Sequence, residues 1–318
     1  MRSGSILKIV LFVVVLTIWS SRGTCQPNTG EEIYLPVAVF SQDGNIVADL
    51  PQSRFSIEVD KSPLRLSGFS NQSSPASILI LVDCSGSVRA KLDDKLELIK
   101  SNLVAFMQSS HPASEYAVYT FNQSAKLEID WNQNSLEAAN KINQVEFAKS
   151  AGVTNLYDSC IEAMQSLKDR KNKKRIVLII TAVVDTNSKY KDSDLKKLSY
   201  ELLSPIFFIN VGGVRINRAN DVAGGSLDLL AENTASEIAL LTGGLAVLPR
   251  TREGIADSFK RFAAFVKYQY LIGINTASIP KDNKPHKLQV KINVPPDAPK
   301  EMKKLKIIYP QFYFSKKP

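Results

Sequence analysis

The sequence contains little cysteine and almost no histidine. Its 318 residues include 3 cysteines and 2 histidines. Three cysteines are too few for the disulfide framework of a small secreted scaffold, so the fold must rest on a hydrophobic core. A nucleophilic enzyme needs a positioned base, and the sequence has no G-x-S-x-G, H-E-x-x-H or phosphate-loop motif. We therefore expect that the protein is not an enzyme.

A hydrolase remains as a remote alternative. Its nucleophile would be Ser85, Ser87 or Cys84. Its base would have to be His111 or His286, and no motif places either of them beside those side chains.

The cysteines leave two other possibilities open. Cys160 shares an apolar helical stripe with Leu156 and Met164, which indicates a buried thiol. A Cys84–Cys160 disulfide stays open in an oxidising compartment, because sequence alone does not fix the separation of the two Cα atoms. Cys25 would lie near the new N-terminus if a leader were removed, and a lipid anchor on it is a less favoured alternative.

Acidic residues are fewer than basic ones. The chain has 31 Asp and Glu against 40 Lys and Arg, a formal net charge of +9. The basic residues are spread along the chain apart from two runs, 171–175 and 300–306. No aromatic residues interleave with them as a base-stacking platform would require, so we interpret both runs as solvated surface and expect no nucleic-acid partner.

Long apolar runs are confined to the N-terminus. Arg2 and Lys8 precede an apolar stretch over 9–19, and small residues follow it, which is the order of a secretory signal peptide at residues 1–24. The stretch is too short to cross a bilayer, and no later run reaches about 20 residues. We expect a secreted or periplasmic protein without an integral membrane span.

The middle of the chain alternates buried strands with amphipathic helices. Apolar runs without alternation predict strands buried on both faces of a parallel sheet, at 77–83, 175–181 and 205–211. Helical spacing is present at 92–106, 155–167, 226–242 and 255–266, and at 135–144 with Ser135 as its cap. A hairpin is expected over 115–131. The pattern predicts a doubly wound, mostly parallel α/β sheet with helices on both faces over 75–266.

The two flanks read as short strands. They are expected at 33–40, 55–59 and 64–69, and again at 270–274, 287–294 and 305–314. Neither flank has enough strands for an independent domain, so we expect them to pair into one small β-rich unit. The predicted organisation is a leader at 1–24, an N-terminal flank at 25–74, the α/β domain at 75–266 and a C-terminal flank at 267–318.

One group of side chains forms a candidate cation-binding site. Asp83, Ser85 and Ser87 follow the first buried strand directly, at the end of a parallel strand where ligands bind in open α/β sheets. Thr154 precedes the helix at 155–167 and offers another hydroxyl. Such an all-oxygen set suits a hard divalent cation, Mg²⁺ above all. A capped helix start is the simpler reading of the same residues.

These residues resemble the metal-ion-dependent adhesion site (MIDAS) of von Willebrand factor type A (VWA) domains. Flanking features, among them Leu241-Thr242-Gly243-Gly244 and Tyr270-Leu271-Ile272-Gly273, resemble those of exported bacterial VWFA-related proteins common in acidobacteria. The resemblance implies that Ser85, Ser87 and Thr154 bind the ion directly and that Asp83 acts through water. A carboxylate of a partner protein would complete the coordination shell.

The sequence departs from the family at one position. Where the family usually has Thr/Ser-Asp-Gly, this chain reads Thr181-Ala182, and the nearest acid is Asp185. Asp185 is a further candidate ligand. With one carboxylate fewer, affinity for Mg²⁺, Mn²⁺ or Ca²⁺ should fall.

The expected function is therefore an exported, non-enzymatic protein-binding or adhesion module that uses a MIDAS to bind an acidic group of its partner. The alternative is a structural envelope or extracellular interaction protein whose site is degenerate and metal-free.

Overall fold

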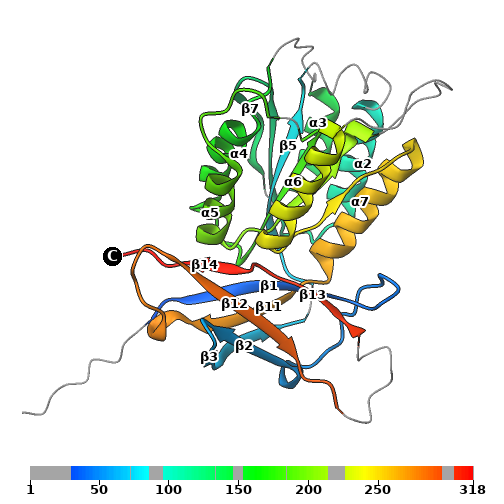
Figure 1. Cartoon of the computed structure of the whole chain (residues 1–318). Helices are drawn as coiled ribbons and strands as arrows, with labels where there is room; N and C mark the ends of the chain where they lie inside the picture. The colour runs from blue at the N-terminus through cyan, green and yellow to red at the C-terminus, as the bar shows by residue number, and fades with distance from the viewer. Residues whose placement is uncertain are drawn as a thin grey trace, which may run out of the picture.

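The computed structural model describes most of the chain from residue 30 onward. The described residues are 30–71, 73–85, 96–132, 134–145, 153–183, 185–213, 226–295 and 304–317. The predicted signal peptide, Cys25 and Ser87 lie outside them, and the predicted division at residues 74 and 266 stays a prediction. Figure 1 shows two units, one of mixed helices and strands and one of strands, which we call the α/β unit and the β-unit.

The α/β unit is built on a six-stranded sheet in the order β10-β9-β8-β5-β6-β7. Its strands are β5 (Ala76–Asp83), β6 (Glu115–Phe121), β7 (Ala125–Asn132), β8 (Lys174–Thr181), β9 (Ile206–Asn210) and β10 (Ala246–Val247). All neighbouring pairs are parallel except β6 with β7, which form the predicted antiparallel hairpin. Every residue of β5 is buried, as expected for a strand covered on both faces.

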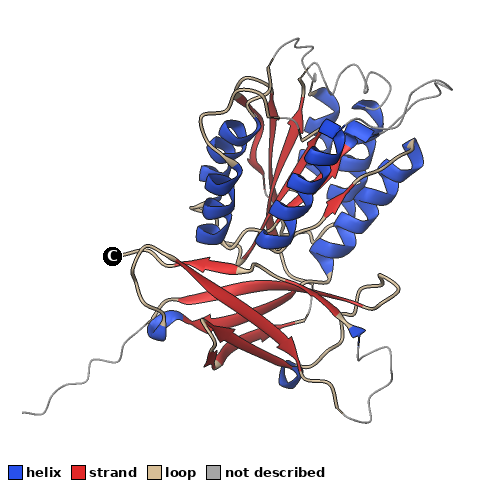
Figure 2. Cartoon of the chain, viewed as in Figure 1, coloured by secondary structure: helices blue, strands red, loops and turns tan. Residues whose placement is uncertain are grey.

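Helices cover both faces of this sheet, which confirms the predicted fold class (Figure 2). They are α2 (Leu96–Ser109), α3 (Ser135–Gln144), α4 (Leu156–Met164), α5 (Asp192–Leu202), α6 (Ser226–Thr242) and α7 (Arg252–Lys267), with 3-10 turns at Gln52–Arg54, Gln165–Leu167, Val211–Gly213 and Thr276–Ser278. The apolar residues of α2, α3 and α7 pack on one face, and those of α4, α5 and α6 on the other.

Two details of the helices differ from the prediction. The sequence analysis predicts no helix between β8 and β9, where the structure has α5, although its buried Leu195, Leu198 and Leu202 recur at helical spacing. The cap of α3 is Asn134, not Ser135, because the Asn134 side chain accepts the N–H groups of Leu136 and Glu137.

The strands of the two flanks pair with each other, as predicted. They form two four-stranded sheets, in the orders β13-β1-β11-β4 and β14-β12-β2-β3. The strands are β1 (Glu32–Phe40), β2 (Phe55–Val59), β3 (Ser62–Leu64), β4 (Leu66–Ser70), β11 (Tyr270–Asn275), β12 (Pro285–Ile292), β13 (Lys306–Ile308) and β14 (Phe312–Phe314). The central pairs β1–β11 and β2–β12 each join one strand from either end of the chain. Their apolar side chains share one core.

The predicted strands at 64–69 and 305–314 are each split in two. In both cases the chain passes from one sheet to the other: β3 pairs with β2 and β4 with β11, while β13 pairs with β1 and β14 with β12. Pro310 lies at the second break, where its missing N–H suits an interruption of pairing.

The C-terminal segment joins the two units (Figure 1). The backbone N–H of Gln311 donates to the Leu241 carbonyl at the end of α6, at 2.9 Å. Phe312 packs against Tyr200 of α5 with ring centroids 5.3 Å apart. None of the helices in the described ranges has both the length and the apolar character needed to cross a membrane.

Candidate functional site

The candidate site lies where β5 and β8 end. Asp83 is the last residue of β5 and is 1% exposed. One of its carboxylate oxygens accepts the Ser85 N–H at 2.8 Å, and the other accepts the Thr181 hydroxyl at 2.6 Å. The carboxylate is thus fixed by a turn on its own strand and by a side chain of the neighbouring strand.

The environment of Asp83 opposes its ionised form. Burial raises the pKa of the Asp83 carboxyl above its ordinary value, against hydrogen bonds from Ser85, Thr181 and the Ala182 backbone, which lower it. A divalent cation nearby would favour the carboxylate, because opposite charges lower the pKa of an acid.

Thr154 lies at the same edge of the sheet. It is 2% exposed, and its N–H and carbonyl both bond to the Thr186 hydroxyl, at 2.8 and 3.1 Å. The next residue, Asn155, donates its N–H to the Asn122 carbonyl beyond β6, at 2.7 Å. Since the N–H of Cys84 donates to the carbonyl of Phe121, the segments bearing Asp83 and Thr154 both border the end of β6.

Asp185 lies beside the start of α4. Its Oδ1 accepts the Leu156 N–H at 2.8 Å and the Ser188 hydroxyl at 2.6 Å, and its Oδ2 accepts the Ser188 N–H at 3.3 Å. These bonds position the loop after β8 against the helix N-terminus, where a negative charge is favourable. A role as metal ligand stays a prediction for Asp185.

Ala182 occupies the position where the family usually has an acid. It is 7% exposed and lies against Gly212, whose added Cβ would be 3.2 Å from the Cβ of Ala182. No carboxylate therefore reaches the site from this position.

The donor set fits a hard cation in its chemistry, because Asp83, Ser85 and Thr154 all offer oxygen and come from segments that meet at one sheet edge. Their burial restricts the access of an ion to these residues, because Ser85 is 1% exposed and Thr154 is 2% exposed. Within the described ranges no three His, Cys, Asp or Glu side chains group as a metal site, so an ion here would depend on these hydroxyls.

Thr181 is the residue of the site that sequence reasoning missed. Its hydroxyl donates to Asp83 and accepts the Val183 N–H at 2.9 Å. The available signal was its position at the end of β8, directly before Ala182.

The hydrolase alternative finds no imidazole base here. His111 follows α2 at the opposite edge of the sheet, and His286 lies in the β-unit. The possible Cys84–Cys160 disulfide is not formed: both thiols are free and buried. Burial raises the pKa of Cys84 to about 12, so it is not an activated nucleophile.

Comparison with known proteins gives a family match. The family model described as "von Willebrand factor type A domain" matches residues 78–185. No curated protein matches the chain. Similar solved structures include an aerotolerance-related membrane protein from Bacteroides fragilis, at 15% identity and TM-score 0.46, covering 60% of this chain and 98% of that one.

Two others are similar over part of their length. A von Willebrand factor type A protein from Catenulispora acidiphila has 14% identity and TM-score 0.43, covering 75% of this chain and 51% of that one. Proximal thread matrix protein 1 from the mussel byssus, with a zinc-occupied MIDAS motif, has 13% identity and TM-score 0.46, covering 59% and 47%. Residues 78–185 are thus similar to a von Willebrand factor type A domain, in agreement with the resemblance of the residues around Asp83.

Proposed function

We propose that this protein is an exported protein-interaction module whose VWA domain binds a divalent cation at the end of β5. Ser85, Ser87 and Thr154 would hold the ion directly, and Asp83 through water. The cation would supply a positively charged contact for a carboxylate of the partner protein. The observation that carries the proposal is the meeting of Asp83, Ser85 and Thr154 at one edge of the parallel sheet.

Mg²⁺ is the ion that this donor set suits best. Hydroxyl and carboxylate oxygens are hard ligands, and Mg²⁺ usually keeps several waters in its octahedral shell. Few protein ligands are therefore needed. One remaining position can then pass from water to a partner's carboxylate, which links metal binding to protein binding.

A metal-free interaction module is the second candidate. Three observations favour it: Ala182 supplies no carboxylate, burial raises the pKa of Asp83, and the hydroxyl-bearing residues Ser85 and Thr154 are almost fully buried. In that case the Asp83–Thr181 hydrogen bond would be a structural tie between β5 and β8, and other surfaces would make the partner contacts.

Calorimetric titration separates the two candidates. Mg²⁺ and Mn²⁺ are titrated into chelator-stripped full-length protein and into Asp83→Asn, with circular dichroism to show that the variant is folded. Asp257→Asn is the matched control, because Asp257 is an exposed carboxylate on α7. The proposal expects saturable heat in the wild type and the control, and loss of that heat in Asp83→Asn. Equal absence of heat in all three proteins would establish the metal-free candidate.

A gain-of-function variant tests the missing acid. Ala182→Asp restores the family's carboxylate next to the site, and a further negative charge there should attract the cation. We expect affinity for Mn²⁺ to rise by about tenfold or more, which corresponds to about 1.4 kcal/mol. Unchanged affinity would show that the departure at Ala182 is not what limits binding.

A further inference from the structure

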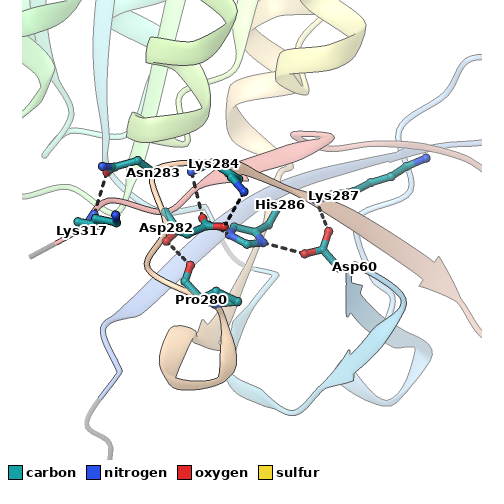
Figure 3. Close-up of polar contacts among 9 residues, drawn as sticks. Asp60, Pro280, Asp282, Asn283, Lys284, His286, Lys287 and Lys317 are labelled. Atoms are coloured by element: carbon teal, nitrogen blue, oxygen red, sulfur yellow. Dashed lines mark hydrogen bonds and ion pairs between the residues drawn. The ribbon is translucent and has the colours of Figure 1, made fainter.

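His286 has both ring nitrogens in contact with carboxylates. It lies near the start of β12 and is 5% exposed. Nδ1 is 2.7 Å from Oδ2 of Asp60, and Nε2 is 3.1 Å from Oδ1 of Asp282 (Figure 3). A neutral imidazole has one N–H, so both contacts are hydrogen bonds only when the ring carries two protons.

Asp60 fastens the turn between β2 and β3. Its other oxygen accepts the Lys287 N–H at 2.9 Å, and its own N–H donates to the Lys287 carbonyl at 2.9 Å. Asp60 and Lys61 have φ of 48° and 69°, a left-handed pair that lacks the usual glycine. The turn is therefore held by contacts with β12, to which His286 contributes.

Asp282 stabilises the loop before β12 by hydrogen bonds, and this loop is in turn hydrogen-bonded to the C-terminal segment. Asp282 accepts the Lys284 N–H at 3.1 Å as well as the His286 contact. The Pro280 carbonyl accepts the Ser315 hydroxyl, and Asn283 accepts the Lys317 N–H at 2.9 Å (Figure 3). The position of the loop thus fixes the residues that follow β14.

The strand β14 in turn contacts the α/β unit. It pairs with β12, where Tyr313 is opposite His286, and it lies against α5. Lys197 of α5 stacks over the Phe314 ring at 4.8 Å, and Lys316 pairs with Glu201 at 2.8 Å. A path of direct contacts therefore runs from His286 through the Asp282 loop and β14 to the VWA domain.

We propose that His286 is a protonation-dependent latch: its doubly protonated ring closes the contacts to Asp60 and Asp282 and thereby holds β14 against the α/β unit. Loss of one proton leaves one carboxylate facing a nitrogen lone pair. That contact then becomes repulsive, and the loop and β14 are held less firmly.

The charged groups around the ring support this direction. Asp60 faces it from the β2–β3 turn, Asp282 from the loop with Lys284 behind it at 3.9 Å, and Tyr313 lies opposite on β14. Burial alone would lower the pKa of His286, but the hydrogen bonds to Asp60 and Asp282 outweigh it and raise the pKa above 6.5. A raised pKa means that the latch is closed in acid and opens as pH rises through the folded-state value.

The titration of His286 is the first test. The chain has 2 histidines, so proton NMR of the full chain should show two imidazole Cε1–H signals, and His111→Gln assigns them. We expect a His286 midpoint above 6.5 that falls in Asp282→Asn, which keeps the histidine and removes one charge. A midpoint at or below 6.5, or one unaffected by Asp282→Asn, would overturn the latch.

Hydrogen exchange is the second test. Amide protection in residues 304–317, corrected for the intrinsic pH dependence of exchange, is measured by mass spectrometry at pH 5.5 and 8.5. We expect protection in the wild type and in His111→Gln to fall by about fivefold or more at pH 8.5, and in His286→Gln to be low at both values. The same pH response in His286→Gln as in the wild type, or an equal change throughout the chain, would contradict the proposal.

Discussion

The hydroxyl of Thr181 donates to the carboxylate of Asp83 at 2.6 Å and so joins the ends of β8 and β5. The same oxygen accepts the N–H of Val183, a β-branched residue with a φ of 57°. Left-handed backbone is unfavourable for such a residue and persists only where its surroundings enforce it. Thr181 therefore supports both the candidate ligand Asp83 and the strained turn that follows β8.

Replacing Thr181 with valine should destabilise the protein by about 2–3 kcal/mol. The change keeps the shape of the side chain but removes the donor to a buried carboxyl and leaves the Val183 N–H without its acceptor. Thr181→Ser keeps the hydroxyl and is the matched control, with an expected loss below about 1 kcal/mol. Urea unfolding measures both, and equal stability of the two variants would show that the hydroxyl is not what matters.

The next prediction tests whether Asp185 is a metal ligand or a residue that positions the loop after β8. Its oxygens already accept bonds from Leu156 and Ser188, so we expect Asp185→Ala to lower the free energy of unfolding by about 1 kcal/mol through loss of this helix-end contact. We expect affinity for Mn²⁺, measured by calorimetry, to change less than about threefold. A fall of tenfold or more would instead make Asp185 a ligand, as the sequence suggests.

Two glycines with similar backbone test how the C-terminal segment docks. Gly243 at the end of α6 has φ +82°, and an added Cβ would lie 2.3 Å from the nitrogen of Pro310. Gly44 has φ +79° with nothing within 4 Å. Gly44→Ala should cost about 1 kcal/mol from the backbone alone. Gly243→Ala should cost clearly more, since the chain at Pro310 must move.

Thermal and urea unfolding of the two alanine variants measure this difference. Hydrogen exchange should also show lower protection around residues 309–314 in Gly243→Ala, with no such change in Gly44→Ala. Equal losses of stability in the two variants would mean that the segment is not held against α6.

The sequence predicts the sheet better than it predicts the site. The uninterrupted apolar runs within β5 and β8, at 78–82 and 176–180, predict buried strands, because burial on both faces disfavours polar residues in the middle of a strand. The helix α5 was open to prediction as well, because Leu195, Leu198 and Leu202 recur at helical spacing, and its omission is an error of the sequence analysis. The split at Pro310 depends on which strand each half pairs with, and this is a tertiary choice.

Within the site, the sequence places Asp83 and Ser85 together because their spacing is short and a buried strand precedes them, whereas Thr154 is linked to them only by the resemblance to the VWA family. The contact of Thr181 joins the ends of two strands, and those of Asp185 join a loop to a helix, so both form only when distant segments meet on folding. Their hydrogen bonds join residues 98 and 29 positions apart in the chain, which no local pattern reveals.

Lys174 is a buried lysine with no carboxylate among its described contacts. It is 0% exposed, and its Nζ donates to the Val266 carbonyl in the last turn of α7, at 2.8 Å. Burial lowers the pKa of Lys174 from 10.5 to about 8. The unfolded chain therefore binds this proton more tightly than the folded protein, and the stability of the wild type should rise with pH between about 8 and 10.5.

Lys174→Met removes that penalty, at the expense of one hydrogen bond to the end of α7. The pKa difference corresponds to about 3 kcal/mol and the lost bond to about 1 kcal/mol, so we expect the variant to be more stable by about 1–2 kcal/mol at pH 7. Its advantage should shrink or vanish at pH 10, where the native lysine is already neutral. Lys260→Met, at an exposed position on α7, is the control and should show no such pH dependence. Urea unfolding at the two pH values decides the matter: a variant that is less stable at pH 7, or equally favoured at pH 10, would show that the Lys174 ammonium is well accommodated beneath α7.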